Sequence, residues 1–130
     1  LGICVGMQML FSESYEFGQH KGLNLLKGKV IKINTKSLNV PNIGWSELNL
    51  SKSSRLFKNI NDKKINVYFM HSYECIPDNK KISNSYINYE KKICSSIEKG
   101  NIFGLQFHPE KSNFNGLKIL DNFIKLDVLH

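Results

Sequence analysis

The sequence predicts one α/β domain with an antiparallel insertion, and three features carry that prediction. A glycine-rich strand–turn–helix pattern opens the chain at residues 1–10. Two apolar runs, 66–75 and 102–107, are typical of strands that are buried on both faces. A helix with an apolar stripe follows Ser112. Strands and helices in this order favour the α/β class.

Local patterns predict the other elements. The first helix is expected to continue over 7–16, with glycines at its exit. Further predictions are strands at 29–34 and 45–50, a turn at 41–44, and a helix at 54–60 capped by Ser54. Strands 85–89 and 93–98 are expected to pair as a hairpin around residues 90–92. The apolar stripe of the last helix is assigned to Leu117, Leu120, Phe123, Ile124 and Leu126.

Length and charge narrow the class of protein. A chain of 130 residues fits a single domain, here residues 1–130. The net charge of +7 raises the question of nucleic-acid binding, but the lysines are dispersed and never form a run longer than two. No binding motif accompanies them, so nucleic acid is not an expected partner. No apolar run approaches the roughly 20 residues of a membrane span, so no membrane is expected either.

Cysteine usage bears on compartment and metal binding. The chain has three cysteines, Cys4, Cys75 and Cys94, with no Cys-x-x-Cys spacing. An odd number without that spacing argues against a disulfide framework and against a zinc site. We therefore expect a reducing, cytoplasmic setting and no metal, with Cys75 and Cys94 as packing residues.

The start of the chain lies inside a predicted strand. Residue 1 is Leu rather than Met. We expect that an N-terminal portion with the first strands is absent. The chain would then be the C-terminal part of its domain.

Gly2-x-Cys4-x-Gly6 is the thiol counterpart of the nucleophile elbow, a sharp strand-to-helix turn. Such a turn leaves little room for Cβ atoms, which explains the glycines. The N–H groups of the following helix are expected to lower the thiol pKa, and the Val5 N–H to stabilise an oxyanion. The alternative is that Cys4 is a small buried apolar residue.

His108-Pro109-Glu110 comes directly after a predicted buried strand, where loops carry function in α/β sheets. Residues i and i+2 of extended chain point the same way, so Glu110 is expected to orient the His108 ring. With Cys4 they would form an activated nucleophile. The alternative is a strand-end histidine with one surface hydrogen bond.

Together, Gly2-x-Cys4-x-Gly6-x-Gln8 and Phe107-His108-Pro109-Glu110 resemble the class I, triad-type glutamine amidotransferases. The resemblance extends to 44–45, 68–73 and 101–112 and covers nearly the whole chain. It implies a flavodoxin-like open sheet, mixed parallel and antiparallel. The longer strings resemble the branch of the family that serves histidine biosynthesis.

The resemblance implies a role for each matching residue. Cys4 would attack the side-chain amide of L-glutamine, His108 would transfer protons, and Glu110 would orient His108. The segment that holds the α-amino and α-carboxylate groups of glutamine matches Gln8, Ser72 and Tyr73. No cofactor is implied. His71 is expected to make a local hydrogen bond or to face the partner.

The resemblance also implies a partner. In this branch a (β/α)₈-barrel cyclase uses the ammonia, and the Gly44-Trp45 segment faces it. Trp45 is therefore expected to be an interface anchor, the alternative being a core residue. The family usually has His and Asn where this chain has Asn42 and Ser46. Its N-terminal part supplies an oxyanion strand, so this chain would carry half an oxyanion site.

Three other functions stay open. Asn42 and Ser46 are compatible with a paralogous ammonia donor for another pathway, such as amidination of a surface sugar. A stand-alone hydrolase with the same triad is a second possibility, and the 68–73 string argues against it. A non-catalytic scaffold is the third.

Overall fold

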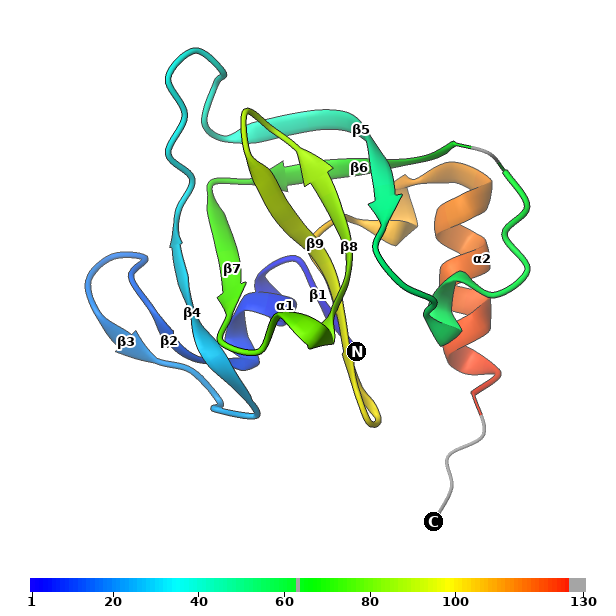
Figure 1. Cartoon of the computed structure of the whole chain (residues 1–130), viewed down its shortest axis with the longest axis horizontal. Helices are drawn as coiled ribbons and strands as arrows, with labels where there is room; N and C mark the ends of the chain where they lie inside the picture. The colour runs from blue at the N-terminus through cyan, green and yellow to red at the C-terminus, as the bar shows by residue number, and fades with distance from the viewer. Residues whose placement is uncertain (63, 127–130) are drawn as a thin grey trace.

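Two β-sheets organise the computed structural model, which describes residues 1–62 and 64–126 (Figure 1). In the described part of the chain, the larger sheet has the strand order β1-β10-β9-β8-β5-β6, and the smaller has β3-β2-β4-β7. The larger sheet comprises β1 (Gly2–Ile3), β5 (Asn42–Leu50), β6 (Ile65–His71), β8 (Ser83–Asn88), β9 (Lys92–Lys99) and β10 (Ile102–Leu105). The smaller comprises β2 (Phe11–Ser14), β3 (His20–Lys21), β4 (Leu26–Lys32) and β7 (Tyr73–Pro77).

Helices and 3₁₀ turns complete the fold. They are α1 (Val5–Met9), η1 (Arg55–Phe57), η2 (Lys80–Ile82), η3 (Pro109–Lys111) and α2 (Asn113–Ile124). Figure 1 shows the smaller sheet on the left and α2 on the right, with β8 and β9 between them. Parallel pairing joins β1 to β10 and β2 to β4, and the other named pairs are antiparallel. The predicted mixed α/β class is confirmed.

The larger sheet curls, so that its two ends approach each other. β6 is the last strand in the order, yet Tyr68 forms an antiparallel bridge with His108, just beyond β10. The His108 N–H donates to the Tyr68 carbonyl at 2.9 Å. This closure brings residues from opposite ends of the strand order into one region.

The predicted hairpin is present as β8 and β9, and β10 is a buried strand between β1 and β9, as predicted. At the hairpin tip, Glu90 adopts a positive φ of 61°. Its carboxylate accepts hydrogen bonds from the backbone N–H groups of Lys36, Ser37 and Leu38. The Ser37 hydroxyl and these N–H groups lower the pKa of Glu90 to about 2. The hairpin tip is thereby fastened to the loop before β5.

The predicted helix over 7–16 is wrong beyond Met9. The chain turns at Leu10 and enters β2, which pairs with β4. Phe11 is fully buried there, and the Ser12 hydroxyl bonds the backbone of Gly28. Partners distant in the sequence therefore override a local pattern that also fits a helix.

The run at 66–75 is not one strand buried on both faces. The chain changes sheet at Ser72, with β6 in the larger sheet and β7 in the smaller. Burial alternates along β6, and its buried residues are Ile65, Val67, Phe69 and His71. The sequence is apolar on both faces because part of the outer face of β6 is an exposed apolar surface.

Three smaller predictions also need correction. Residues 42–44 belong to β5 rather than to a turn, and the strand expected at 45–50 is its remainder. Ser54 caps through the Leu56 N–H as predicted, but the helix is a single 3₁₀ turn, η1. On α2, Leu117 and Ile124 are exposed. The buried residues of α2 are Gly116 and Ile119, and Phe123 and the following Leu126 pack against the core.

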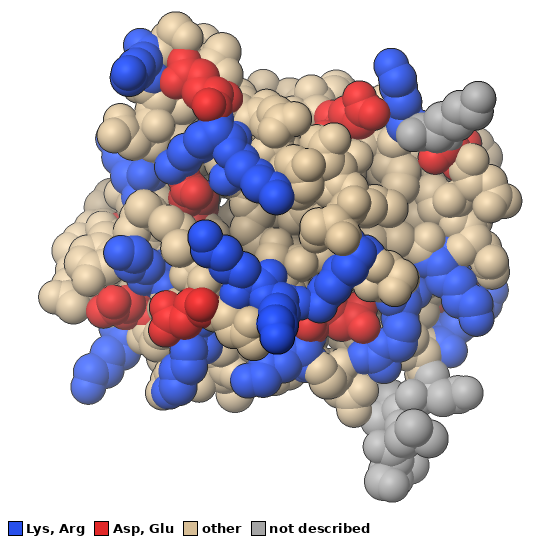
Figure 2. All heavy atoms as spheres, in the orientation of Figure 1, with Lys and Arg blue, Asp and Glu red and all other residues tan. Residues whose placement is uncertain are grey.

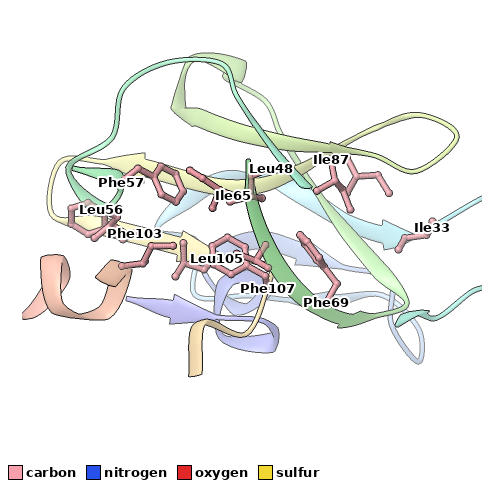
Figure 3. Packing of buried hydrophobic residues seen from close by; sticks show 13 residues of the cluster. Ile33, Leu48, Leu56, Phe57, Ile65, Phe69, Ile87, Phe103, Leu105 and Phe107 are labelled. Carbon is pink, nitrogen blue, oxygen red and sulfur yellow. The ribbon is translucent and has the colours of Figure 1, made fainter. Parts of the chain in front are cut away.

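The core consists of two clusters of buried side chains. Figure 3 shows the larger one as a continuous row that runs from Leu56 and Phe57 at one end to Ile33 at the other. Phe69 and Phe107 lie near its middle with their rings edge to face, 5.9 Å apart. The smaller cluster lies under the second sheet and includes Met7, Phe11 and Cys75. Cys75 and the partly buried Cys94 are packing residues, as predicted.

Basic residues occur in many places on the face seen in Figure 2. Figure 2 shows lysines and arginine across the viewed face with acidic residues between them. Among the described residues, no helix has the length and apolar content that a membrane crossing requires.

Candidate active site

Cys4 occupies a strained turn between β1 and α1. Its backbone has φ 54° and ψ −109°, a conformation that side-chain-bearing residues rarely adopt. The Cys4 N–H donates to the Leu105 carbonyl of β10 at 2.7 Å, which holds the turn against the sheet. Strain of this kind costs about 1–3 kcal/mol and concentrates at functional sites. The strand–turn–helix prediction for residues 1–10 is confirmed.

The two glycines of the elbow have different reasons to be glycine. A Cβ on Gly2 would lie 2.5 Å from the Gly6 carbonyl oxygen, so no side chain fits there. A Cβ on Gly6 would have no described atom within 4 Å, so the predicted crowding at that position is wrong. Gly104, which faces Gly2 across the β1–β10 pair, is also crowded, but by side chains: a Cβ there would lie 2.7 Å from Met7 Cγ. Close packing of α1 on the sheet explains Gly2 and Gly104.

Cys4 is 8% exposed, and burial raises the pKa of its thiol above the ordinary value. The Val5 N–H and the Gln106 amide oppose this by lowering the pKa. Burial is the larger effect, so the expected depression of the pKa is not found in this structure. The thiol instead donates to the Met70 carbonyl, with Sγ and O 3.6 Å apart. A thiol in this state needs a base to become a nucleophile.

His108 and Glu110 form a hydrogen-bonded pair, with Nδ1 and Oε2 3.0 Å apart. The predicted geometry, that of an extended strand, is wrong, because Pro109 starts the 3₁₀ turn η3. The Ser112 hydroxyl donates to the His108 carbonyl at 2.6 Å and accepts from the Tyr68 N–H, so it anchors this turn instead of capping α2. The His108 and Glu110 side chains are 22% and 48% exposed. A neutral His108 ring held through Nδ1 leaves Nε2 as an acceptor.

The sheet places Cys4 and His108 at the same edge. β1 and β10 are parallel neighbours, with Ile3 opposite Leu105. Cys4 follows the first strand, and His108 lies just beyond the second, at the edge where ligands bind in open α/β sheets. Glu110 acts electrostatically on the thiol and raises its pKa. In the described chain, no hydrogen bond joins Cys4 to His108; such bonds in ligand-free sites are often long and tighten with substrate.

The residues matched to substrate binding lie close to one another, and Gln106 links them to the thiol. Gln8 is buried on α1, and its Nε2 donates to the Tyr73 carbonyl at 3.2 Å. Ser72 is the corner between β6 and β7, and its carbonyl accepts from the Ile33 N–H at 2.9 Å. Gln8 and the Ser72–Tyr73 corner are therefore brought together.

Trp45 is 51% exposed on β5, so the alternative of a core residue is wrong. Its ring packs edge to face against Tyr68 of β6, with centroids 5.9 Å apart. Ile43 and Met70 are opposite each other across the same strand pair and are also exposed. Asn42, in contrast, is 3% exposed and points inward, so its departure from the family pattern is not on the outer face.

Three buried polar side chains beside the site were not given a catalytic role from the sequence: Asn42, His71 and Gln106. His71 makes the local hydrogen bond that was one of its two expected roles, to the Tyr73 carbonyl at 2.8 Å. Gln106 is fully buried in an otherwise apolar run. A polar residue in such a run needs a partner, and that was the available signal. Within residues 1–62 and 64–126, no group of three or more His, Cys, Asp or Glu side chains is placed to hold a metal.

Comparison with known protein families identifies the family to which the chain belongs. The model of the family "Glutamine amidotransferase class-I" matches residues 1–126. The chain belongs to this family. The predicted membership is confirmed.

Individual class-I glutamine amidotransferases are similar over nearly the whole chain. The imidazole glycerol phosphate synthase subunit HisH of Pelagibacter ubique is 48% identical over 128 residues, which are 97% of this chain and 61% of the relative. The corresponding subunit of Chlorobaculum tepidum is 46% identical over 124 residues, 95% of this chain and 61% of the relative. The chain thus spans about 61% of the length of these curated relatives.

A solved structure of a protein from Thermoplasma acidophilum, described as a component of GMP synthase, shares the fold. It aligns with a TM-score of 0.64 at 24% identity and covers 95% of this chain and 54% of that one. This likeness fits the flavodoxin-like sheet that the resemblance implied.

Proposed function

We propose that the protein is the glutaminase subunit of an imidazole glycerol phosphate synthase. It would hydrolyse L-glutamine to glutamate and ammonia and deliver the ammonia to a cyclase subunit in histidine biosynthesis. The observation that carries the proposal is the pairing of the Cys4 elbow with the His108–Glu110 pair at one sheet edge. The similarity to HisH subunits from several bacteria supports the choice of pathway.

In the first proposed step, Cys4 Sγ attacks the side-chain carbonyl carbon of glutamine. Because burial raises the pKa of this thiol, its proton must leave as the bond forms. Neutral His108 would accept that proton at Nε2 and pass it to the leaving nitrogen. Ammonia departs and a glutamyl thioester remains. The Val5 N–H, which already acts on the sulfur, is the donor assigned to the developing oxyanion.

In the second step, His108 activates a water molecule that hydrolyses the thioester to glutamate. Glu110 holds Nδ1 throughout, so that Nε2 always faces the reaction. Gln8 and the Ser72–Tyr73 corner would hold the α-amino and α-carboxylate groups of the substrate. None of these steps requires a cofactor.

The partner is proposed to be a (β/α)₈-barrel cyclase that docks on the outer face of β5 and β6. Ile43, Trp45 and Met70 expose apolar surface there, beside the thiol. Trp is enriched at the centres of interfaces. Free ammonia at neutral pH is mostly protonated and non-nucleophilic, so direct transfer protects the product. The proposed compartment is the cytoplasm, supported by three free cysteines.

The test measures glutamate release by the full-length protein, with and without a bacterial cyclase subunit. We expect glutamine-dependent synthesis by the pair and its loss in Cys4→Ala. Ammonia-dependent synthesis by the cyclase should remain in that variant. Glutamine hydrolysis by Cys4→Ala at the wild-type rate would rule out the assignment. Hydrolysis without any coupling to the cyclase would favour an ammonia donor for another pathway.

A further inference from the structure

A continuous chain of buried and partly buried hydrogen bonds leads from β5 to the Cys4 thiol. We propose that Gln106 stabilises the Cys4 thiolate by hydrogen bonding during the reaction, and that His71 is a positioning residue that holds the Tyr73 carbonyl in place, on which the donating orientation of Gln106 depends. We call the chain the polar relay; its members are Asn42, His71, the Tyr73 carbonyl, Gln8, Gln106 and Cys4. The catalytic part of the proposal rests on the glutaminase function proposed above.

The orientation of the relay is set at the Tyr73 carbonyl, which can only accept hydrogen bonds. His71 Nδ1 lies 2.8 Å from this oxygen, so Nδ1 carries the hydrogen. In the neutral ring Nε2 then accepts, and the amide of Asn42, 3.1 Å away, donates to it. Burial lowers the pKa of His71, which favours the neutral ring. Both ring nitrogens are therefore used.

The same carbonyl fixes the amide of Gln8. Its Nε2 lies 3.2 Å from the Tyr73 oxygen, and the reversed amide would place two acceptors face to face. The same Nε2 lies 3.4 Å from Gln106 Oε1 and uses its second hydrogen there. Gln8 Oε1 is consequently the end that remains for the substrate, whose α-amino group needs an acceptor.

Gln106 must then present its nitrogen to the sulfur. Its Oε1 is committed to Gln8, and its Nε2 lies 3.8 Å from Cys4 Sγ. An N–H donor at this distance stabilises the thiolate more than the thiol, because hydrogen bonds to charged groups are stronger. Gln106 is fully buried, so water does not compete for this amide. Because the Tyr73 carbonyl accepts from Gln8, and Gln8 donates to Gln106 Oε1, the Gln106 N–H is directed at the Cys4 sulfur.

Groups outside the relay also affect the pKa of the Cys4 thiol, and their contributions should be the same in the wild type and in the relay variants. Burial, Glu110 and Glu16 raise the pKa of the thiol, while the Val5 N–H lowers it. None of these contributions passes through Gln106. Changing the relay should consequently move the thiol pKa while they stay in place.

The test is the pH dependence of Cys4 alkylation by iodoacetamide in the full-length protein, followed by mass spectrometry of the Cys4 peptide. Resolving the peptide separates Cys4 from Cys75 and Cys94. Gln106→Leu removes the donor, and we expect the alkylation midpoint to rise by about one pH unit. Gln106→Glu is isosteric but presents a carboxylate oxygen to the sulfur, so its midpoint should rise further. An unchanged midpoint in both variants would overturn the role of Gln106.

A second pair of variants tests His71 as a positioning residue. His71→Leu removes the bond to the Tyr73 carbonyl, and we expect a smaller rise of the midpoint than in Gln106→Leu. His71→Asn places an amide nitrogen near the position of Nδ1 and should restore the midpoint toward the wild-type value. A wild-type midpoint in His71→Leu, with Gln106→Leu shifted, would contradict the positioning role.

The control is Asn122→Leu, which removes the hydrogen bonds from Asn122 to the carbonyls of Leu56 and Lys58, away from the thiol. It should lower the melting temperature without moving the alkylation midpoint. The alkylation measurement requires no glutamine. An inactive wild-type protein with the expected midpoint shifts would refute the glutaminase function alone, whereas an active protein without shifts would refute the relay alone.

Discussion

The two ends of the β5–β6 pair follow opposite rules. At the end away from Cys4, apolar Leu48 and Ile65 pair on the buried face, and polar Glu47 and Asn66 pair on the outer face. At the end beside Cys4 the pattern is inverted. Polar Asn42 and His71 are buried as a pair, 3% and 5% exposed, while Ile43 and Met70 are 58% and 41% exposed.

The inversion separates two sets of residues on the β5–β6 pair. One end stabilises the fold, and the other carries residues that we propose to serve function. Buried apolar pairs contribute to folding through the hydrophobic effect. Buried polar side chains contribute little net stability and need partners, which Asn42 and His71 find in each other and in the Tyr73 carbonyl. Exposed apolar pairs contribute little to the folded monomer and suit a partner surface. One strand pair thus holds a core at one end and a site at the other.

The largest expected effect lies at the inverted end. Cys4→Ala removes the proposed nucleophile, and we expect glutaminase activity to fall by about 10³-fold or more. Cys75→Ala and Cys94→Ala remove packing residues and should alter only stability, measured by thermal unfolding. A comparable loss of activity in either of these two would assign the chemistry to the wrong thiol.

At the other end, Leu48→Ala should lower the free energy of unfolding by about 2–5 kcal/mol, because it leaves a cavity in the core. Denaturant unfolding of the full-length protein measures this change. The matched control is Ile43→Ala on the same strand, which should change stability by no more than about 0.5 kcal/mol. Equal destabilisation by both substitutions would show that the two ends do not differ as described.

Trp45→Ala tests the outer face of the inverted end. We expect binding to the proposed cyclase partner to weaken by about 2 kcal/mol, roughly 30-fold in Kd, and the proposed glutamine hydrolysis to become uncoupled from synthesis. The melting temperature should barely move, because the side chain is half exposed. Leu50→Ala, at 49% exposure on the far end of the same strand, is the control for binding. A steep drop in melting temperature with unchanged Kd would place Trp45 in a structural role instead.

The smallest effect is expected away from both ends, at Glu90. Its pKa is lowered to about 2 by the Ser37 hydroxyl and the N–H groups of Lys36, Ser37 and Leu38. The carboxylate therefore stabilises the fold at pH values above about 4.5, and this contribution is lost as pH falls through 2. The difference in melting temperature between wild type and Glu90→Gln should shrink from pH 5 to pH 2. The control is Glu47→Gln, which removes an exposed carboxylate that has no hydrogen bond in the described chain and should change the melting temperature little at pH 5.

Local chemistry was sufficient to predict the parts of the site that lie within a few residues of one another. One example is the strand–turn–helix elbow around Cys4. Only glycine fits at position 2, because a Cβ there would collide with the Gly6 carbonyl. The β8–β9 hairpin likewise depends on neighbouring residues. His108 and Glu110 are in contact as predicted, although through a 3₁₀ turn, because two residues so close in sequence meet in several backbone conformations.

Only the tertiary structure decided which elements meet. The sequence could not show that the chain changes sheets at Ser72, because the change depends on the distant strands that β6 and β7 pair with, β5 and β4. Residues 11–14 likewise form the strand β2 because they pair with the distant strand β4. The relay joins α1, β5, β6, the residue after β10 and a β7 carbonyl, so no local pattern contains it. Local sequence determines turn geometry and periodicity, whereas strand pairing and buried polar contacts depend on residues that are brought together only by the folded chain.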